Sequence, residues 1–530
     1  TDAYCADYEI INNDLLVLLS DIFRNPDIKK YVYSIKDVIV DLNGITEFSG
    51  ITFDAKIGSY LINPSKSTDL DFLAAEYLGV YLDNQEAAQL SLFNDDAPRD
   101  RDAKYAHIIF AVSEAIADKI EANSQHDLYY NVELPLINVL ADMQISGFAV
   151  DTDELVRFGS FLEEHIRLLE QKIYALAGEE FNINSPKQLG EILFGKLGLK
   201  GGKKTKTGYS TKADVLEKLA PDNEIVQLVL EYRTYQKLKS TYCDGLISLV
   251  NPKTGRIHSV FHQTGTVTGR LSSSEPNMQN IPTRTELGRE LRKMFSAKEG
   301  CVLIDADDSQ IELRVLAHLA QDPVMIDAFR SGEDIHAVTA SKILNIPIDR
   351  LTKEQRNSAK AINFGIVYGM SEYTLSQDLK ISFGEAKKYM NEYFSKYSGV
   401  RKYLDSLKEF AHAKGYVTTI MNRIRYIPEL KSPQAMVRSF GERAAMNTPV
   451  QGSAADIMKC AMVRVYNRLQ AEKLKSQIIL QVHDELIIEA PYNEEEQVKA
   501  ILKSEMENAI KLDVPLIVDM ESGKSWYDAK

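Results

Sequence analysis

At 530 residues the chain exceeds what one hydrophobic core usually holds, so roughly two to four domains are expected. Its 44% hydrophobic and 26% charged residues are typical of a globular protein, and no apolar run is long enough to predict a membrane span. The four cysteines are widely spaced, which argues against a zinc site, and the net charge of −14 leaves any nucleic-acid contact to local basic segments.

The N-terminal region, up to about residue 128, is acidic and mixes helix-like with strand-like patterns. Thr1 stands where an initiator Met would be and no secretory segment follows, so we expect a fragment or a processed product from a reducing cytosol. Leu90–Arg101 is predicted to be a loop. Asp7 and Glu9 form an isolated D-x-E pair, for which surface acids are a better interpretation than a metal site.

Long helical patterns follow. An apolar helix is predicted from Val132 to Gly147, another over Leu155–Leu176, and a helix start at Asn184–Pro186 with Ser185 as its cap. Lys196–Lys212 then holds six lysines and no acid, and Glu224–Leu249 is again helical. A flexible basic loop between helices favours phosphate contact through Lys203, Lys204 and Lys206, although a solvated helix tip has the same composition.

Between residues 252 and 282 the pattern changes to short strands and polar turns. Gly265–Ser274 and Glu275–Pro282 are dense in hydrogen-bonding side chains. Phosphates, sugars or minor-groove edges are suitable partners, and a plain polar loop is the alternative. The candidates in these two segments are Arg270, Asn277, Gln279 and Asn280.

The segment Cys301–Arg314, CVLIDADDSQIELR, begins as a buried strand and ends in three carboxylates, Asp305, Asp307 and Asp308. Ser309 and Glu312 have the spacing of a capping box, which predicts a helix from there. Carboxylates at the rim of a core indicate a bound cation or a proton transfer that balances them. A solvated turn at the strand end is the alternative interpretation.

Gln355–Gly369 follows a helix that begins at Asp334–His336. Four side chains in it recur every four residues and form one stripe, two cations followed by two aromatics: Arg356, Lys360, Phe364 and Tyr368. Cations one turn apart suit a bridging anion, and aromatic faces suit base stacking, so the stripe predicts a bound nucleoside triphosphate. A structural helix with solvated cations is the alternative.

A second spacing of four joins Arg443, Asn447 and Gln451, with Pro449 expected near the end of their helix. Ser476–Ala490 has two apolar runs around His483, Asp484 and Glu485, which predicts a hairpin with acids at its tip. If this tip meets the acids near Asp307, hard oxygen ligands without a Cys or His cluster favour Mg²⁺. Together the parts indicate phosphoryl transfer.

Five stretches in this order resemble motifs of family A DNA polymerases: TGRLSSSEPNMQNIP, DADDSQIELR, RNSAKAINFGIVYG, ERAAMNTPVQGSAAD and QVHDEL. The resemblance runs from about Val132 to Lys530. It implies an α/β (α+β) multidomain fold, a right hand of thumb, palm and fingers after a degenerate 3′–5′ exonuclease-like (ribonuclease H-like) domain. The implied ranges are 1–128 for the exonuclease-like domain, 129–250 for the thumb, 251–325 and 431–530 for the palm, and 326–430 for the fingers.

The resemblance also implies roles for the candidate residues. Asp307, Asp484 and the backbone carbonyl of Asp308 would hold two Mg²⁺ ions, replaceable by Mn²⁺, with Glu485 assisting and Lys360 as a proton donor to pyrophosphate. The nucleotide would contact Arg356, Lys360, Phe364, Tyr368, His336, Gln310 and Glu312, the last excluding ribonucleotides. Primer–template DNA would contact Arg270, Asn277, Gln279, Asn280, Arg443, Asn447, Gln451, His483, Lys203, Lys204 and Lys206.

Three departures from the family pattern stand out. Asp308 replaces a usual tyrosine, and its carboxylate beside Asp307 is expected to raise local pKa values or recruit extra metal. Asn357 replaces a frequent arginine, which is expected to weaken phosphate binding slightly. In the N-terminal domain Phe53–Asn63 and Tyr105 resemble exonuclease segments, but Ile109 stands where an aspartate is expected, so we predict no proofreading.

The main hypothesis is therefore a DNA-templated DNA polymerase that adds dNTPs to a primer 3′-hydroxyl and releases pyrophosphate. A single-subunit RNA polymerase-like enzyme and a non-catalytic DNA-binding relic are the alternatives; Glu312 and Phe364 argue against the first, and the complete set of acids against the second. The expected partners are primer–template DNA and dNTPs, without a membrane. We expect a monomer in the bacterial cytoplasm, associated with the nucleoid.

Overall fold

The computed structural model describes residues 13–81, 97–202, 204–205, 208–282, 285–367 and 369–530. The chain forms two compact units, and each is assembled from segments that lie far apart in the sequence. The first unit comprises Thr1–Ser146, Val260–Ser274 and Ile304–Glu521, and the second comprises Gly147–Ser259, Glu275–Leu303 and Ser522–Lys530. The five domain ranges expected from the sequence divide the chain differently and stay a prediction.

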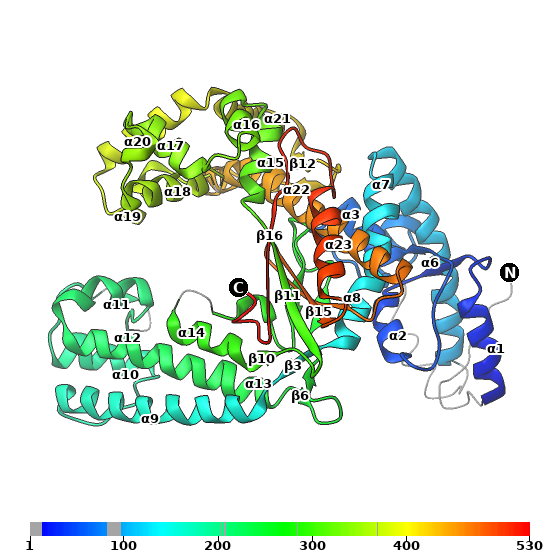
Figure 1. Cartoon of the computed structure of the whole chain (residues 1–530), viewed down its shortest axis with the longest axis horizontal. Coiled ribbons are helices and arrows are strands. Elements are labelled where there is room, and N and C mark those ends of the chain that lie inside the picture. The colour runs from blue at the N-terminus through cyan, green and yellow to red at the C-terminus, as the bar shows by residue number, and fades with distance from the viewer. Residues whose placement is uncertain (1–12, 82–96, 203, 206–207, 283–284, 368) are drawn as a thin grey trace. The chain divides into compact units, whose positions relative to one another are not determined.

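The first unit is mostly helical and carries its strands in small sheets (Figure 1). Its helices are α1(Asn13–Arg24), α2(Ile35–Asp41), α3(Ala55–Ile62), α4(Leu70–Leu73), α6(Ala97–Ala122), α7(His126–Leu128), α8(Leu134–Ser146), α15(Ile311–Ala320), α16(Pro323–Arg330), α17(Ile335–Leu344), α18(Lys353–Val367), α19(Glu372–Asp378), α20(Phe383–Lys396), α21(Ser398–Lys414), α22(Ala435–Ala471) and α23(Glu495–Glu507). Its strands are β1(Lys30–Val32), β2(Ile51–Asp54), β8(Val260–His262), β9(Ser272–Ser274), β11(Cys301–Asp308), β12(Tyr416–Thr418), β13(Ile424–Tyr426), β14(Gln477–Val482), β15(Glu485–Pro491) and β16(Val518–Gly523), with the start of β11 and the end of β16 in the second unit.

The four-stranded sheet of this unit has the order β14-β15-β11-β16, so β11 is an inner strand. The apolar residues Val302–Ile304 of β11 are buried, as a strand covered on both faces requires. Strands β14 and β15 are antiparallel and pair Val482 with Glu485, which leaves His483 and Asp484 as a two-residue turn. His483 has a φ of 53°, the left-handed conformation that such hairpin turns need. The predicted hairpin and the predicted strand are both confirmed.

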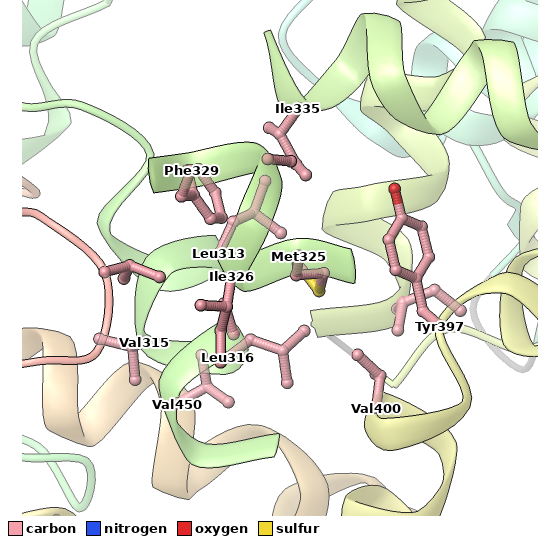
Figure 2. Packing of buried hydrophobic residues seen from close by; sticks show 14 of the residues in the cluster. Leu313, Val315, Leu316, Met325, Ile326, Phe329, Ile335, Tyr397, Val400 and Val450 are labelled. Carbon is pink, nitrogen blue, oxygen red and sulfur yellow. The ribbon is translucent and has the colours of Figure 1, made fainter. Parts of the chain in front are cut away.

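A large apolar core of the unit lies where α15 meets the helices that follow it. Figure 2 shows Leu313 and Leu316 of α15 beside Met325 and Phe329 of α16, with Val450 of α22 on the other side. Leu313 and Leu316 lie three residues apart, on the same face of the helix, and both are fully buried. This packing fixes the helix that directly follows the acidic end of β11.

Helix α22 runs through the unit for 37 residues, and Pro449 lies inside it. The prediction that the helix ends near Pro449 is wrong. Proline removes one helix hydrogen bond and usually ends or kinks a helix. Here Thr448 donates its hydroxyl to the Ala444 carbonyl at 2.7 Å, and nearly every residue from Thr448 to Cys460 is buried, so tertiary packing outweighs the local preference.

The N-terminal part of the unit packs α3 and α6 around a separate apolar cluster that includes Phe53, Tyr60 and Ile116. Strands β1 and β2 pair in parallel beside it. Residues 97–101 belong to α6, so the loop predicted over Leu90–Arg101 is wrong there, while its preceding residues lie outside the described part of the chain. Among the described helices, none combines the length and the apolar character needed to cross a bilayer.

The second unit consists of a helical part and a four-stranded sheet of order β10-β3-β7-β6. Helices α9 and α12 lie side by side, as Figure 1 shows, around buried residues such as Leu169, Ile173 and Val229. Its helices are α9(Thr152–Ala177), α10(Pro186–Gly190), α11(Ala213–Leu219), α12(Glu224–Lys237), α13(Gly245–Ile247) and α14(Glu286–Glu290). Its strands are β3(Phe148–Val150), β4(Lys204–Thr205), β5(Gly208–Tyr209), β6(Val250–Asn251), β7(Arg256–Ile257) and β10(Phe295–Ser296).

Two helix signals in this unit are confirmed. Gly147 has a φ of 61° and separates α8 from β3, and Ser185 caps α10 by accepting the N–H of Gln188. The lysine-rich segment differs from the flexible loop that was expected, because β4 and β5 pair Lys204 with Tyr209 in a short antiparallel ladder.

Candidate active site

The acidic end of β11 meets the acidic turn of the β14–β15 hairpin. The backbone N–H of Asp308 donates to the carbonyl oxygen of Asp484 at 3.0 Å. Asp307 and Asp484 are both half-buried, whereas Asp305 and Glu485 are buried. The fold therefore gathers the predicted acidic residues of two distant segments at one place in the first unit.

This site can be compared with what a divalent cation requires. Among the described residues, no group of three or more His, Cys, Asp or Glu side chains is placed to hold a metal ion. Mg²⁺, however, is commonly bound by one or two carboxylates, with water and substrate phosphates completing its octahedron. Half-buried Asp307 and Asp484 supply oxygen donors of that kind, so the residues fit such an ion when it arrives with a triphosphate.

Asp308 behaves differently from its neighbour. Successive residues of a strand point to opposite faces, and the Asp308 side chain is only 2% exposed. Burial, followed by the charges of Asp484 and Asp307, raises the pKa of Asp308 to about 8, while Arg314 acts in the opposite direction. The expected rise of a local pKa is thus confirmed. The recruitment of an extra metal ion by Asp308 stays a prediction.

Glu312 does not form the predicted capping box. The N-cap of α15 is Gln310, in a left-handed conformation with a φ of 56° and without a side-chain cap. Glu312 is 3% exposed and its Oε1 accepts a hydrogen bond from Arg270 Nη2 at 2.7 Å. This charged pair joins two candidates, one for the nucleotide and one for DNA, that lie 42 positions apart in the sequence.

The cationic stripe lies on α18 as predicted. Arg356 is paired with Asp334, Nε to Oδ2 at 2.5 Å, and Asp334 also caps α17 by accepting the N–H groups of His336 and Ala337. Burial opposes ionisation of Asp334, but the hydrogen bonds from Arg356 and the two backbone N–H groups outweigh it and lower its pKa. Lys360, one turn further along, is exposed. Arg356 is thereby held in place while Lys360 is open to solvent.

His336 is buried beside this stripe, with its ring 5.8 Å from that of Phe364. Thr339 donates to Asn363 Oδ1 at 3.2 Å, which orients the Asn363 amide so that its Nδ2 faces His336 Nδ1 at 2.9 Å. The ring proton then lies on Nε2. Burial lowers the pKa of His336 to about 4, with the charges of Arg356 and Lys360 adding to it, so the imidazole is neutral at physiological pH. A neutral ring can donate one hydrogen bond to a phosphate but adds no charge.

The polar row of α22 is partly accessible. Arg443, Asn447 and Gln451 are all half-buried along the same helix face. The C-terminal end of α18 approaches this row, because a Cβ built on Gly369 would lie 3.4 Å from the Cγ of Arg443. His483 is exposed at the hairpin turn. These four predicted DNA contacts therefore belong to the same unit as the acids.

Arg270 also lies in the first unit, and the other predicted DNA contacts belong to the second unit. Asn277 caps a 3₁₀ turn, η7(Met278–Asn280), and accepts the N–H of Gln279. Tyr242 donates its hydroxyl to the carbonyl oxygen of Asn280 at 2.7 Å, which ties this turn to the long helical segment. Lys204 lies in β4. Lys203, Lys206 and Tyr368 lie outside the described residues, as do Asp7 and Glu9.

Two neighbours of the stripe were missed by the sequence reasoning. The sequence indicates that Asp334 starts a helix, but it does not indicate that Asp334 pairs with Arg356. The two residues lie 22 positions apart, and no local spacing links them. Asn363 lies between Ile362 and Phe364 and is fully buried. A polar amide on the apolar side of a helix is the signal that could have identified it.

The N-terminal domain uses its exonuclease-like residues for structure. Asp54 is 1% exposed and accepts backbone N–H groups from Ile35, Lys56 and Ile57, so its carboxylate caps α3. Tyr105 donates its hydroxyl to Asp71 at 2.8 Å. Both groups are thus occupied by contacts within the domain, and Ile109 supplies no carboxylate.

Comparison with known proteins gives consistent matches. Residues 152–528 match the profile of DNA polymerase family A, and residues 2–87 match that of the ribonuclease H-like domain of DNA polymerase I. The chain is 47% identical over 526 residues to DNA polymerase I of Caldicellulosiruptor bescii, covering 98% of this chain and 60% of that protein. It is 47% identical over 511 residues to the Geobacillus stearothermophilus enzyme, covering 95% of this chain and 58% of that protein.

A solved structure is also similar: the POL domain of Pol1 from M. smegmatis in complex with DNA primer-template and dNTP, with a TM-score of 0.91 and 39% identity. The match covers 99% of this chain and 90% of that one. The predicted fold class, a mixed α/β polymerase fold with a ribonuclease H-like domain, is confirmed. The chain spans about three fifths of the length of the curated relatives that it matches, 60% and 58% for the two above.

Proposed function

Because the chain belongs to DNA polymerase family A, we propose that it is a DNA-directed DNA polymerase that adds dNTPs to a primer 3′-hydroxyl on a template and releases pyrophosphate. The observation that carries the proposal is the hydrogen bond from the Asp308 N–H to the Asp484 carbonyl oxygen, which supports a shared site for the half-buried carboxyl groups of Asp307 and Asp484. A similar polymerase domain is a complex with primer-template and dNTP, which supports the same partners here.

Members of this family use divalent metal ions, and we propose that Asp307, Asp484 and the carbonyl of Asp308 hold two Mg²⁺ ions, with Mn²⁺ as a substitute. Bound there, such ions supply Lewis-acid activation of the attacking hydroxyl and neutralise charge on the leaving pyrophosphate. Glu485, which is buried next to Asp484, assists these residues in the proposal.

The chain's own residues position the nucleotide. Arg356 exchanges its partner Asp334 for a phosphate, and Lys360 contacts a second phosphate and donates a proton to pyrophosphate. Neutral His336 donates from Nε2, and Phe364 packs on the base or sugar, with Gln310 and Tyr368 completing the contacts. Glu312, held by Arg270, occupies the space that a ribose 2′-hydroxyl would need. Asn357 supplies no charge on this helix.

DNA binds to residues of both units in this proposal. Arg270, Arg443, Asn447, Gln451 and His483 contact primer–template near the acids. The amide-rich segment and the lysine-rich segment contact the duplex backbone through Asn277, Gln279, Asn280, Lys203, Lys204 and Lys206. In terms of domains, residues 129–250 act as thumb, 251–325 and 431–530 as palm, and 326–430 as fingers.

The relatives are bacterial enzymes, and we propose that this protein is cytoplasmic, associates with the nucleoid and acts as a monomer. An RNA polymerase is disfavoured because the matched proteins are DNA polymerases and because Glu312 is fixed by Arg270. We propose that the exonuclease-like domain, residues 1–128, lacks proofreading, because the Asp54 side chain caps α3 and Ile109 supplies no carboxylate.

Primer extension tests the proposal. Wild-type protein should extend a labelled primer with dNTPs and Mg²⁺. Asp484→Ala should lose at least about 100-fold in rate, because a divalent ion contributes several kcal/mol and each 1.4 kcal/mol is a factor of ten. Glu496→Ala, which removes an 89% exposed carboxylate on α23, is the matched control and should keep full activity. An Asp484→Ala protein as active as the control would refute the assignment, and a wild type without extension would favour the DNA-binding relic.

A further inference from the structure

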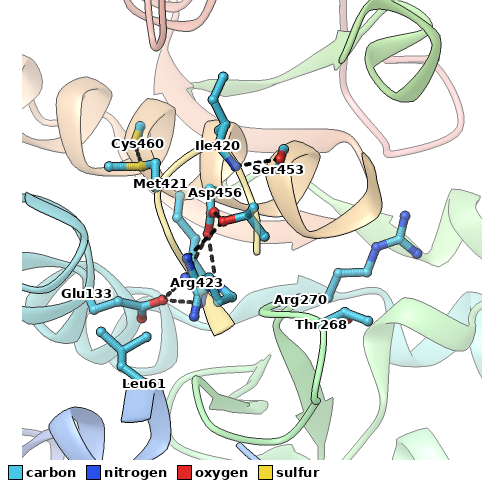
Figure 3. Close-up of polar contacts among 12 residues, drawn as sticks. Leu61, Glu133, Thr268, Arg270, Ile420, Met421, Arg423, Ser453, Asp456 and Cys460 are labelled. Carbon is cyan, nitrogen blue, oxygen red and sulfur yellow. Dashed lines mark hydrogen bonds and ion pairs between the residues drawn. The ribbon is translucent and has the colours of Figure 1, made fainter. Parts of the chain in front are cut away.

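A buried network of four charges lies away from the acidic site. Arg423, 3% exposed, pairs its Nε with Asp456 Oδ1 at 2.8 Å and its Nη2 with Glu133. Lys459 Nζ lies 2.8 Å from Glu133 Oε1, and Thr419 donates its hydroxyl to Asp456 at 2.5 Å. Figure 3 shows Arg423 between Glu133 and Asp456, with Thr268 and Arg270 on the neighbouring loop.

The network combines two acidic with two basic side chains. Burial alone would raise the pKa of Glu133, but the charges of Lys459 and Arg423 outweigh it and lower the pKa to about 2. Burial raises the pKa of Asp456, against the charge of Arg423, and lowers that of Lys459 to about 8, against the charge of Glu133. All four side chains are nearly inaccessible to water. Because both the Nε and Nη2 donors of Arg423 are engaged, its planar guanidinium has one orientation.

The loop that carries Arg270 rests on this guanidinium. A Cβ built on Gly269 would lie 2.5 Å from Arg423 Nε and 2.7 Å from its Cδ. Gly269 also has a φ of 87°, a conformation that favours glycine. A backbone in van der Waals contact with a fixed, flat side chain has no room to move towards it.

Three further contacts hold the same loop. Gln263 donates to the carbonyl oxygen of Glu133 at 2.7 Å, and Tyr60 donates its hydroxyl to the carbonyl oxygen of Thr266 at 2.8 Å. Thr266 in turn donates to the carbonyl oxygen of Arg270 at 2.8 Å. These hydrogen bonds hold the part of the loop that precedes Gly269, and Arg423 contacts the backbone at Gly269 itself.

We propose that Arg423 is a positioning residue: its guanidinium, fixed by Glu133 and Asp456, supports Gly269 and so sets the reach of Arg270 towards Glu312. This inference rests on the proposed function of Arg270 and Glu312 in binding the primer and selecting the sugar. Arg423 itself pairs with Glu133 and Asp456, and it acts on Arg270 through the loop alone. Figure 3 shows Arg270 extending from that loop, away from the network.

A double-mutant cycle tests the proposal, with kcat/KM for dNTP incorporation, the dNTP-to-NTP ratio and the melting temperature measured on each protein. Arg423→Met and Arg270→Ala should each lower kcat/KM by about tenfold and lower the dNTP-to-NTP ratio. The double variant should be no worse than Arg270→Ala, because a residue that acts through Arg270 has nothing left to position. The proposal would be overturned if the kcat/KM loss of the double variant equalled the product of the two single losses. It would also be overturned if Arg270→Ala kept the wild-type kcat/KM.

Lys459→Met is the matched control, since it removes a buried charge from the same network without touching Gly269. Lys459→Met should lower the melting temperature, as Arg423→Met does, but should keep the wild-type kcat/KM. If Lys459→Met lowers kcat/KM as much as Arg423→Met does, the network acts only through stability and the proposal is wrong. If Arg423→Met does not fold, Gly269→Ala perturbs the same contact from the loop side, and its catalytic loss should likewise vanish in the Arg270→Ala background. Wild-type extension of the primer is measured alongside, so failure of the proposed polymerase activity is distinguished from failure of the positioning role.

Discussion

The backbone N–H of Asp308 donates to the carbonyl oxygen of Asp484 at 3.0 Å, which joins the last residue of β11 to the turn between β14 and β15. Together with the pairing of β15 and β11 in one sheet, this bond brings together two acidic segments that are far apart in the chain. It also places the Asp308 side chain, which is 2% exposed, near other carboxylates. The consequences for stability and for chemistry can be measured separately.

Asp308→Asn should stabilise the metal-free protein at high pH. The pKa of Asp308 is about 8 in the folded protein against 3.8 as a reference, so between these values only the folded state holds the proton. The unfolding free energy of wild type therefore falls as pH rises from about 4 to about 8, by up to roughly 5 kcal/mol, whereas that of the asparagine variant does not. Urea unfolding with EDTA at pH 5 and pH 9 measures the difference. Asp405→Asn is the control: its carboxylate is 44% exposed, and the variant should follow wild type. Equal slopes for wild type and Asp308→Asn would contradict the prediction.

Glu312→Ala should weaken selection against ribonucleotides. Removing this buried carboxyl opens the space beside the sugar and leaves Arg270 without the partner at 2.7 Å. We expect the ratio of kcat/KM for dNTP over NTP to fall by at least about tenfold, equivalent to about 1.4 kcal/mol. Glu312→Gln keeps the volume and should retain most of the discrimination. If both variants lose it equally, charge rather than volume is responsible.

Glu133→Ala should destabilise the first unit strongly. Its carboxylate accepts from Lys459 at 2.8 Å and pairs with Arg423, and its removal leaves buried positive charge without compensation. Breaking a buried ion pair from one side typically costs about 3–5 kcal/mol. Denaturant unfolding measures this, with Glu154→Ala, which breaks an exposed pair with Arg157, as the control expected to change stability by about 1 kcal/mol or less. A Glu133→Ala protein as stable as the control would mean that the network contributes little.

Proofreading should be absent. The carboxylate of Asp54 caps α3, Tyr105 is bonded to Asp71, and Ile109 carries no acid. A labelled primer with a 3′ mismatch, incubated with Mg²⁺ or Mn²⁺ but no dNTPs, should keep its length. Steady shortening that EDTA stops, and that persists in Asp484→Ala, would show an active exonuclease and refute the prediction.

Local patterns were enough to predict much of the candidate site. The acidic strand end at Asp307, the stripe of Arg356 and Lys360 on one helix and the hairpin around Asp484 all follow from periods of two and of 3.6 residues, which are properties of the backbone. The order of the motifs then identified the family. Patterns failed where a local preference met a tertiary contact: Pro449 does not end α22, and Glu312 pairs with Arg270 instead of capping its own helix.

The sequence alone thus determined several of the elements, the family and the chemical type of each candidate residue, because these depend on residue identity and on spacing within a segment. Only the tertiary structure decided that Asp308 is buried and mostly protonated, that Asp334 holds Arg356, and that Arg423 supports Gly269. These relationships join segments separated by tens to hundreds of residues. They depend on burial and on distances in space, which a one-dimensional pattern does not contain.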